Sequence, residues 1–149
     1  MDAIETLKHV LFLARHLPKD NVQTAVALIL LELEIPSEYD GFRYLKSAIP
    51  MYYENPSLFL TKELYPAVGK IHGSSGLMVE RSIRFAISSA WKRSDKKAWN
   101  LYFPMNQNRK IQKPSNGEFI AQIARFLELW QNCYEEDDSN ARTSETVAG

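Results

Sequence analysis

Apolar residues recur at helical spacing along most of this sequence, and no segment alternates apolar and polar positions as a half-buried strand does. Read with the prolines, glycines and capping residues at its interruptions, the pattern predicts helices over residues 2–17, 22–33, 40–49, 60–72, 75–93 and 115–130, and a short one near 99–103. We expect an all-α fold of about six to seven helices in a single domain, because 149 residues with 45% hydrophobic positions can bury one good core.

The predicted helix over residues 75–93 separates apolar from basic positions. At 3.6 residues per turn its apolar face consists of Val79, Ile83, Ala86, Ile87 and Ala90. Its opposite face consists of Met78, Arg81, Arg84, Phe85, Ser88 and Lys92. Such a helix can pack with one face and contact a polyanion with the other. Periodicity alone fits an ordinary amphipathic helix with a solvated basic side equally well.

The residues before this helix indicate a tight turn between two helices. Gly73 can adopt a positive φ in the turn, and Ser75 can cap the helix that follows. The small Gly69 allows the two helices to approach closely. The spacing predicts a helix-turn-helix unit, although many helical hairpins that do not bind DNA share it.

Other helix ends carry recognisable signals as well. Capping side chains are expected from Asp20 or Asn21, from Ser37 with Asp40, and from the capping box of Ser115 and Glu118. Pro50 removes a backbone donor, so a kink or an early helix end is expected there. From Glu135 the sequence is acidic and small, and residues 133–149 are expected to form a disordered acidic tail.

The net charge of zero conceals a segregation of charge along the chain. Residues 1–60 carry five Lys or Arg and eight Asp or Glu. Residues 80–113, in contrast, carry nine Lys or Arg and two Asp or Glu, for a net charge of +7. Residues 114–149 carry two Lys or Arg and seven Asp or Glu, for a net charge of −5. A local basic excess beside the candidate helix favours contact with phosphates, since Lys and Arg displace counterions condensed on DNA.

Several classes of protein are not indicated by the sequence. The N-terminus lacks a signal-peptide pattern and no apolar run is long enough to span a bilayer, so a cytoplasmic protein without membrane contact is expected. The single cysteine, Cys133, has no partner at metal-ligand spacing, and His9, His16 and His72 lack a companion motif. We therefore expect no enzyme, no cofactor and no metal site.

Four separated motifs, in order, carry a family resemblance. They are Gly41-Phe42-Arg43-Tyr44-Leu45 with Ala48-Ile49; Thr61-Lys62-Glu63-Leu64-Tyr65-Pro66; Val79-Glu80-Arg81 with Ile83-Arg84 and Ala90-Trp91; and Lys113-Pro114 with Asn116 and Glu118-Phe119-Ile120-Ala121. Over roughly residues 22–131 the chain resembles the C-terminal DNA-binding domain of the sporulation initiation factor, a response regulator of endospore-forming Firmicutes. The resemblance implies a helix-turn-helix domain of the winged-helix-like, response-regulator effector superfamily, which reads the major groove of a promoter.

The resemblance also implies which side chains contact DNA. Glu80, Arg81 and Arg84 match the base-reading positions, and chemistry agrees, because Arg can donate two hydrogen bonds to guanine and Glu can accept one from cytosine N4. Glu80 has a second interpretation, in which it orients Arg84 four residues later. Lys62, Lys92 and Arg93 suit phosphate contacts. The implied DNA-facing set is completed by Ser75, Met78 and Phe85.

The chain departs from the family pattern at three positions. Met78 replaces an arginine and cannot donate a hydrogen bond to a base, so an altered target sequence is expected. Phe85 replaces a polar residue and suits a thymine methyl group or a neighbouring subunit. His72 replaces an apolar aromatic, and we interpret it as a partly buried histidine with a satisfied hydrogen bond.

The expected organisation is an extra N-terminal helix over residues 1–18, a helix-turn-helix domain over residues 19–132, and the tail. No receiver domain fits before the matching region, so phosphorylation in cis is not expected to control the protein. The N-terminal stripe of Ile4, Leu7, Leu11 and Ala14 is expected to pack on the domain, with a short dimer contact as the alternative.

The leading hypothesis is a sequence-specific DNA-binding transcriptional regulator. A homodimer on promoter DNA and a contact with the sigma subunit of RNA polymerase are further partners compatible with it. The alternative is a protein-interaction module of the same fold that modulates another regulator or RNA polymerase, because exposed apolar side chains such as Met78 and Phe85 suit a protein partner.

Overall fold

The computed structural model describes residues 21–103 and 112–148, with side chains described as far as residue 132. The elements, in chain order, are α2 (Val22–Glu32), α3 (Asp40–Glu54), the π-helical turn η1 (Leu60–Leu64), α4 (Tyr65–His72), α5 (Gly76–Arg93), α6 (Lys97–Tyr102) and α7 (Asn116–Ala148). Every regular element in these two ranges is helical, which confirms the all-α prediction. The helix predicted over residues 2–17 lies outside the described residues.

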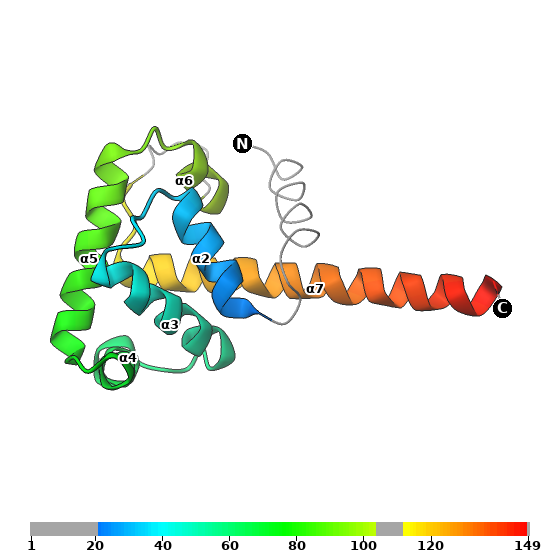
Figure 1. Cartoon of the computed structure of the whole chain (residues 1–149), viewed down its shortest axis with the longest axis horizontal. Helices are drawn as coiled ribbons and strands as arrows, with labels where there is room; N and C mark the ends of the chain where they lie inside the picture. Colours follow the sequence, from blue (N-terminus) through cyan, green and yellow to red (C-terminus); the bar gives the residue numbers. More distant parts are fainter. Residues whose placement is uncertain (1–20, 104–111, 149) are drawn as a thin grey trace.

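Helix α3 lies at the centre of the domain, because it packs against α2, α4, α5 and α7. Helix α4 packs mainly on α5, and together they form the predicted helix-turn-helix pair. Figure 1 shows α5 along one edge of the domain, while α7 crosses the bundle and continues well beyond it. No helix in the described ranges is both long enough and apolar enough to cross a membrane.

The core is rich in aromatic side chains contributed by the last three helices. The Trp99 ring contacts those of Trp91 and Phe119, with centroids 5.4 and 5.7 Å apart. Tyr102 is fully buried and donates a hydrogen bond to Glu32 Oε2 at 2.5 Å, which connects α6 to the end of α2. Burial and the Glu32 carboxylate both raise the pKa of the Tyr102 hydroxyl. This core fixes the ends of α5 and α7 relative to each other.

The predicted caps of three helices are confirmed. Asn21 Oδ1 accepts from Thr24 N at 2.9 Å, and Ser75 Oγ accepts from Met78 N at 3.2 Å. At α7, Ser115 Oγ accepts from Glu118 N at 3.2 Å and donates to the Glu118 carboxylate. Each interaction satisfies a backbone donor that a helix N-terminus leaves free.

The predicted cap of the third helix is wrong. The N-cap of α3 is Tyr39, which makes no side-chain capping hydrogen bond, and Ser37 lies two residues earlier. Asp40 instead lies in the first turn and forms an ion pair with Arg43 at 2.6 Å. A carboxylate in a first turn is stabilised by the helix dipole without acting as the N-cap.

Two predicted helix ends differ from the structure. Helix α3 continues past Pro50 to Glu54, so the early end expected there as the alternative to a kink is wrong. Proline removes one internal hydrogen bond, but the residues after it are still half-buried against the core. Helix α7 continues to Ala148, where a disordered tail was expected. Extending an existing helix needs no new nucleation, which favours helix in the Glu-rich and Ala-containing sequence that follows Trp130.

The helix predicted over residues 60–72 begins with the π-helical turn η1 before it becomes α4. The Glu63 carboxylate accepts a hydrogen bond from Phe59 N at 3.0 Å and so occupies a donor at the start of the turn. The wider turn brings Leu64 and Tyr65 into the core, where they are 0% and 4% exposed. The start of the first helix of the pair is therefore fixed in the core.

Candidate nucleic-acid interface

The turn between α4 and α5 depends on two glycines. Gly73 has a φ of 68°, a conformation that glycine adopts without strain. A Cβ atom at Gly69 would lie 2.7 Å from Ser74 O, so only glycine allows the turn to fold back over α4. The prediction for Gly73 is confirmed, and Gly69 allows close approach of the turn residues Ser74 and Ser75 that lead into α5.

The inner face of helix α5 packs closely against α3. A Cβ atom at Gly41 of α3 would lie 2.6 Å from the Ala86 Cβ and would also contact Ser82 O. The five residues expected on the inner face, Val79, Ile83, Ala86, Ile87 and Ala90, are all buried. The opposite face of α5 therefore points outward in one fixed orientation.

The outward face carries the side chains predicted for it. Arg81, Arg84 and Lys92 are exposed, and Ser88 is half-buried. Met78 and Phe85 remain 50% and 62% exposed, so two apolar side chains lie among the basic ones. In the described part of the chain Arg81 forms no ion pair, which leaves its guanidinium available to a ligand.

Arg84 has a partner on its own helix. Its guanidinium forms an ion pair with Glu80 four residues earlier, and the Glu80 side chain is 26% exposed whereas that of Arg84 is 62% exposed. Glu80 therefore lies at the flank of the outer face rather than at its centre. This geometry favours the interpretation in which Glu80 orients Arg84.

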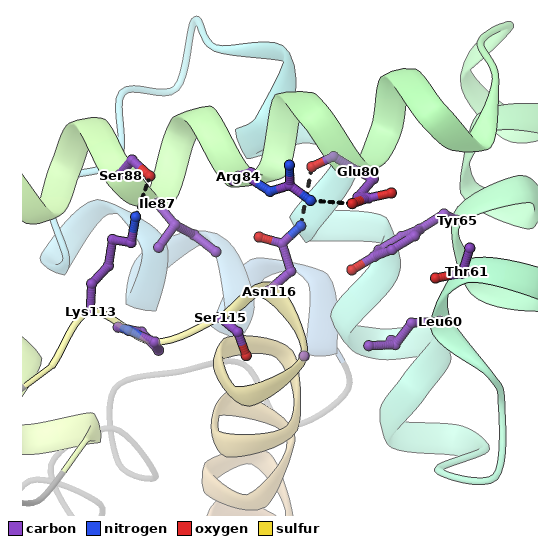
Figure 2. A pocket seen from close by; sticks show the side chains of 12 residues that line it. Leu60, Thr61, Tyr65, Glu80, Arg84, Ile87, Ser88, Lys113, Ser115 and Asn116 are labelled. Atoms are coloured by element: carbon purple, nitrogen blue, oxygen red, sulfur yellow. Dashed lines mark hydrogen bonds and ion pairs between the residues drawn. The ribbon is translucent and has the colours of Figure 1, made fainter.

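A pocket of about 320 Å³ lies beside Arg84, where α5, η1 and the start of α7 meet. Figure 2 shows Lys113 and Asn116 reaching toward α5 from the opposite side of this pocket. Lys113 Nζ donates to Ser88 Oγ at 3.0 Å, and Asn116 Nδ2 donates to the Glu80 carbonyl at 3.1 Å. The fold thus adds a second cation and an amide to the surface around Arg84.

Sequence reasoning did not assign Lys113 and Asn116 to the site. Both belong to the last of the four family motifs, and that motif was the only signal that could have indicated them. Their place beside α5 follows from the packing of α5 against the start of α7, which no local pattern encodes.

Tyr65 closes the inner end of this pocket. The residue is 4% exposed and lines the pocket together with Asn116. Burial raises the pKa of the Tyr65 hydroxyl above its ordinary value. Tyr65 therefore contributes a neutral hydroxyl to the wall of the pocket.

The other flank of α5 is aromatic and acidic. The rings of Phe85 and Tyr39 lie 5.4 Å apart at an interplanar angle of 42°. They line a shallow pocket of about 380 Å³ together with Glu38, Asp40 and Arg81. This side is less suited to phosphate than the Arg84 side, because carboxylates repel a polyanion.

The cations predicted at the end of α5 have different surroundings. Lys92 is exposed. Arg93 donates to the carbonyl oxygens of Ser89 and Glu34, both at 3.3 Å, and so connects α5 to the segment after α2. Lys96 Nζ is bonded to the Trp91 carbonyl and lies 4.5 Å from the Trp91 ring centroid, and it caps the C-terminus of α5. Arg93 thus has a structural role in addition to the phosphate contact predicted for it.

The remaining predicted residues lie on the helix-turn-helix pair and on the π-helical turn before it. Lys62 is exposed in η1, and Ser75 is the exposed N-cap of α5. The His72 ring lies 5.4 Å from that of Tyr44, and its Nε2 is 2.7 Å from Ser47 Oγ. His72 is thus partly buried and hydrogen-bonded, in agreement with its interpretation from the sequence. Among the described side chains no group of His, Cys, Asp and Glu residues could hold a metal ion.

Residues 26–127 match the family described as "Sporulation initiation factor Spo0A C terminal". The match runs from α2 into α7 and includes the whole helix-turn-helix pair and the pocket beside Arg84. The family is a DNA-binding domain involved in the regulation of sporulation in Firmicutes and is not a catalytic family. Since the matched residues make up more than half of the sequence, the chain belongs to the family of sporulation initiation factor C-terminal domains.

Proposed function

We propose that the protein is a sequence-specific transcriptional regulator that inserts α5 into the major groove of promoter DNA. The observation that carries this proposal is the outer face of α5, on which Arg81 and Arg84 are exposed while the inner face is fully packed. A helix of 18 residues is about 27 Å long and fits the major groove, which is about 12 Å wide.

In this proposal both arginines contact bases, but their surroundings on α5 differ. Arg81 lies near the centre of the outer face and is the first candidate for a bidentate contact with guanine O6 and N7. Arg84 lies toward the pocket and is ion-paired with Glu80, so it loses less side-chain conformational entropy when it binds a base. Met78 and Phe85 would meet apolar groups such as thymine methyls and so alter the preferred sequence.

Phosphate contacts would come from residues around the reading helix. Lys62 and Lys92 are exposed near the two ends of the helix-turn-helix pair, and Ser75 is exposed in its turn. Lys113 lies between α5 and the start of α7, so it would contact the backbone beside the groove. Such contacts set the register of the protein on DNA without reading its sequence.

Selection of bound duplexes from a random pool, followed by fluorescence anisotropy on the selected site, tests the proposal. Replacing Arg81 with alanine should weaken binding to the selected site by about 1 to 3 kcal/mol and relax the preference at one base pair. Arg125→Ala is the matched control, because Arg125 is also exposed but lies on α7. The proposal fails if no sequence is enriched, or if Arg81→Ala and Arg125→Ala behave alike.

A second candidate function is supported by the flank formed by Tyr39 and Phe85. The exposed Phe85 ring, packed on the half-buried Tyr39 beside Glu38 and Asp40, suits a protein partner better than DNA, and a second copy of the chain or RNA polymerase would be such a partner. Anisotropy with random duplexes at low and moderate salt separates the two functions. Absence of binding at both salt concentrations would favour the protein-interaction module.

A further inference from the structure

The outer face of α2 is apolar and open in the part of the chain that the structure describes. Leu28 and Leu31 remain 43% and 48% exposed although they lie on a helix whose opposite side is fully buried. Thr24 and Ala27 lie on the same side and are only partly buried. A helix that is apolar on all sides is normally covered on all sides, so this face is suited to cover by another apolar segment.

We propose that residues 2–17 form a helix that lies antiparallel to α2 and covers Leu28 and Leu31. The first argument is the short connection. Only Pro18, Lys19 and Asp20 separate Leu17 from the N-cap Asn21. Connections of about two to five residues join neighbouring antiparallel helices, so the N-terminal segment is held close to α2.

The second argument is the match in length and pattern. A helix over residues 2–17 would be about 24 Å long, and α2 with its 11 residues is about 16 Å long, so the segment can cover the whole outer face. The stripe of this segment, Ile4, Leu7, Leu11 and Ala14, provides an apolar surface of the required kind.

The third argument is the register. In an antiparallel pair, positions at equal distances from the connection face each other. Leu11 and Leu28 both lie six residues from the helix ends nearest the connection, at Leu17 and Val22. Leu7 and Leu31 lie ten and nine residues from those ends. The two exposed leucines of α2 therefore face two leucines of the segment.

The proposed contact leaves the DNA-facing surface open. Helix α2 packs against α3 and α7, whereas α5 packs against α3, α4 and α7. Figure 1 shows α5 along one edge of the domain and apart from α2, so a segment that lies on α2 leaves the outer face of α5 uncovered. The inference does not depend on DNA binding, and its test can fail while DNA binding succeeds.

Cysteine crosslinking in the full chain tests the register. In a background with Cys133→Ser, the pair Leu11→Cys and Leu28→Cys should form a disulfide within one chain on oxidation at low protein concentration. The matched control combines Leu28→Cys with His9→Cys, because His9 is two residues from Leu11 and so lies on the other side of the predicted helix. Crosslinking of the control pair should be several-fold weaker.

The possible outcomes decide between occupants of this face. Disulfides between two chains in the Leu11 and Leu28 variant would show that a second copy covers α2 and would overturn the proposal. Equal crosslinking of both pairs, or of neither, would also overturn it. The pair Leu7→Cys and Leu31→Cys repeats the test at a second position, and circular dichroism of each variant verifies that the helical fold is retained.

Discussion

The ion pair between Glu80 and Arg84 allows the role of each residue in DNA binding to be measured separately. If Arg84 contacts a guanine, Arg84→Ala should cost about 1 to 3 kcal/mol, which corresponds to a roughly 5- to 150-fold higher Kd for the selected duplex. The ion pair itself contributes little to stability, about 0.3 to 0.5 kcal/mol, because the Arg84 side chain is 62% exposed. A large loss of affinity would therefore not come from unfolding.

Glu80→Gln separates positioning from direct reading. If Glu80 only orients Arg84, Glu80→Gln should raise the Kd for the selected duplex when Arg84 is present. The same change should not raise this Kd in a protein that already carries Arg84→Ala. The removal of a negative charge beside phosphate should at the same time increase affinity for random duplexes. Fluorescence anisotropy on selected and random duplexes, with all four proteins of the double-mutant cycle, measures both effects.

The cycle has a clear contrary result. A loss of selected-site affinity from Glu80→Gln that persists in the Arg84→Ala background would mean that Glu80 itself contacts a base. An unchanged Kd in both single variants would refute the assignment of this flank of α5 to base reading. Glu128→Gln is the control for charge, because Glu128 is exposed on α7, away from α5.

Further predictions concern the surroundings of α5. Lys113→Ala should weaken binding to selected and random duplexes alike and reduce the slope of log Kd against log salt by about 1, as measured by anisotropy between low and moderate salt. Ser75→Ala removes the N-cap of α5 and should cost about 1 kcal/mol of unfolding free energy in urea titrations, whereas Ser57→Ala, at an exposed position in the loop after α3, should not. Since folding raises the pKa of Tyr102, its stabilising contribution is complete below the ordinary tyrosine pKa of about 10 and declines at higher pH. Tyr102→Phe should make the free energy of unfolding less dependent on pH in that range.

The sequence predicted most accurately those features that depend on residues close together in the chain. The two faces of α5, the caps at Asn21, Ser75 and Ser115, and the turn at Gly73 each depend on a few neighbouring residues. Local patterns determine such features because helical periodicity and capping act over a few residues.

The features that the sequence did not reveal depend on long-range contacts. Asn116 reaches the Glu80 carbonyl only because the start of α7 packs beside α5. Arg93 bonds to the Glu34 carbonyl across the domain, a contact that its place in a basic segment did not indicate. The end of α7 was missed for a different reason, since composition favoured disorder whereas helix extension from a packed segment needs no nucleation.

The close contact of Gly41 with α5 has a consequence for how the target sequence can change during evolution. Because the backbone of α3 touches α5 directly, the distance of α5 from the domain does not depend on the size of its outward side chains. Residues on the outer face can then be exchanged without repacking the core or tilting the helix. The resemblance to the family predicts that Met78 and Phe85 are such exchanges, and their side chains remain exposed while the inner face of α5 stays fully buried. The domain is thus a scaffold on which recognition can diverge at little cost to folding.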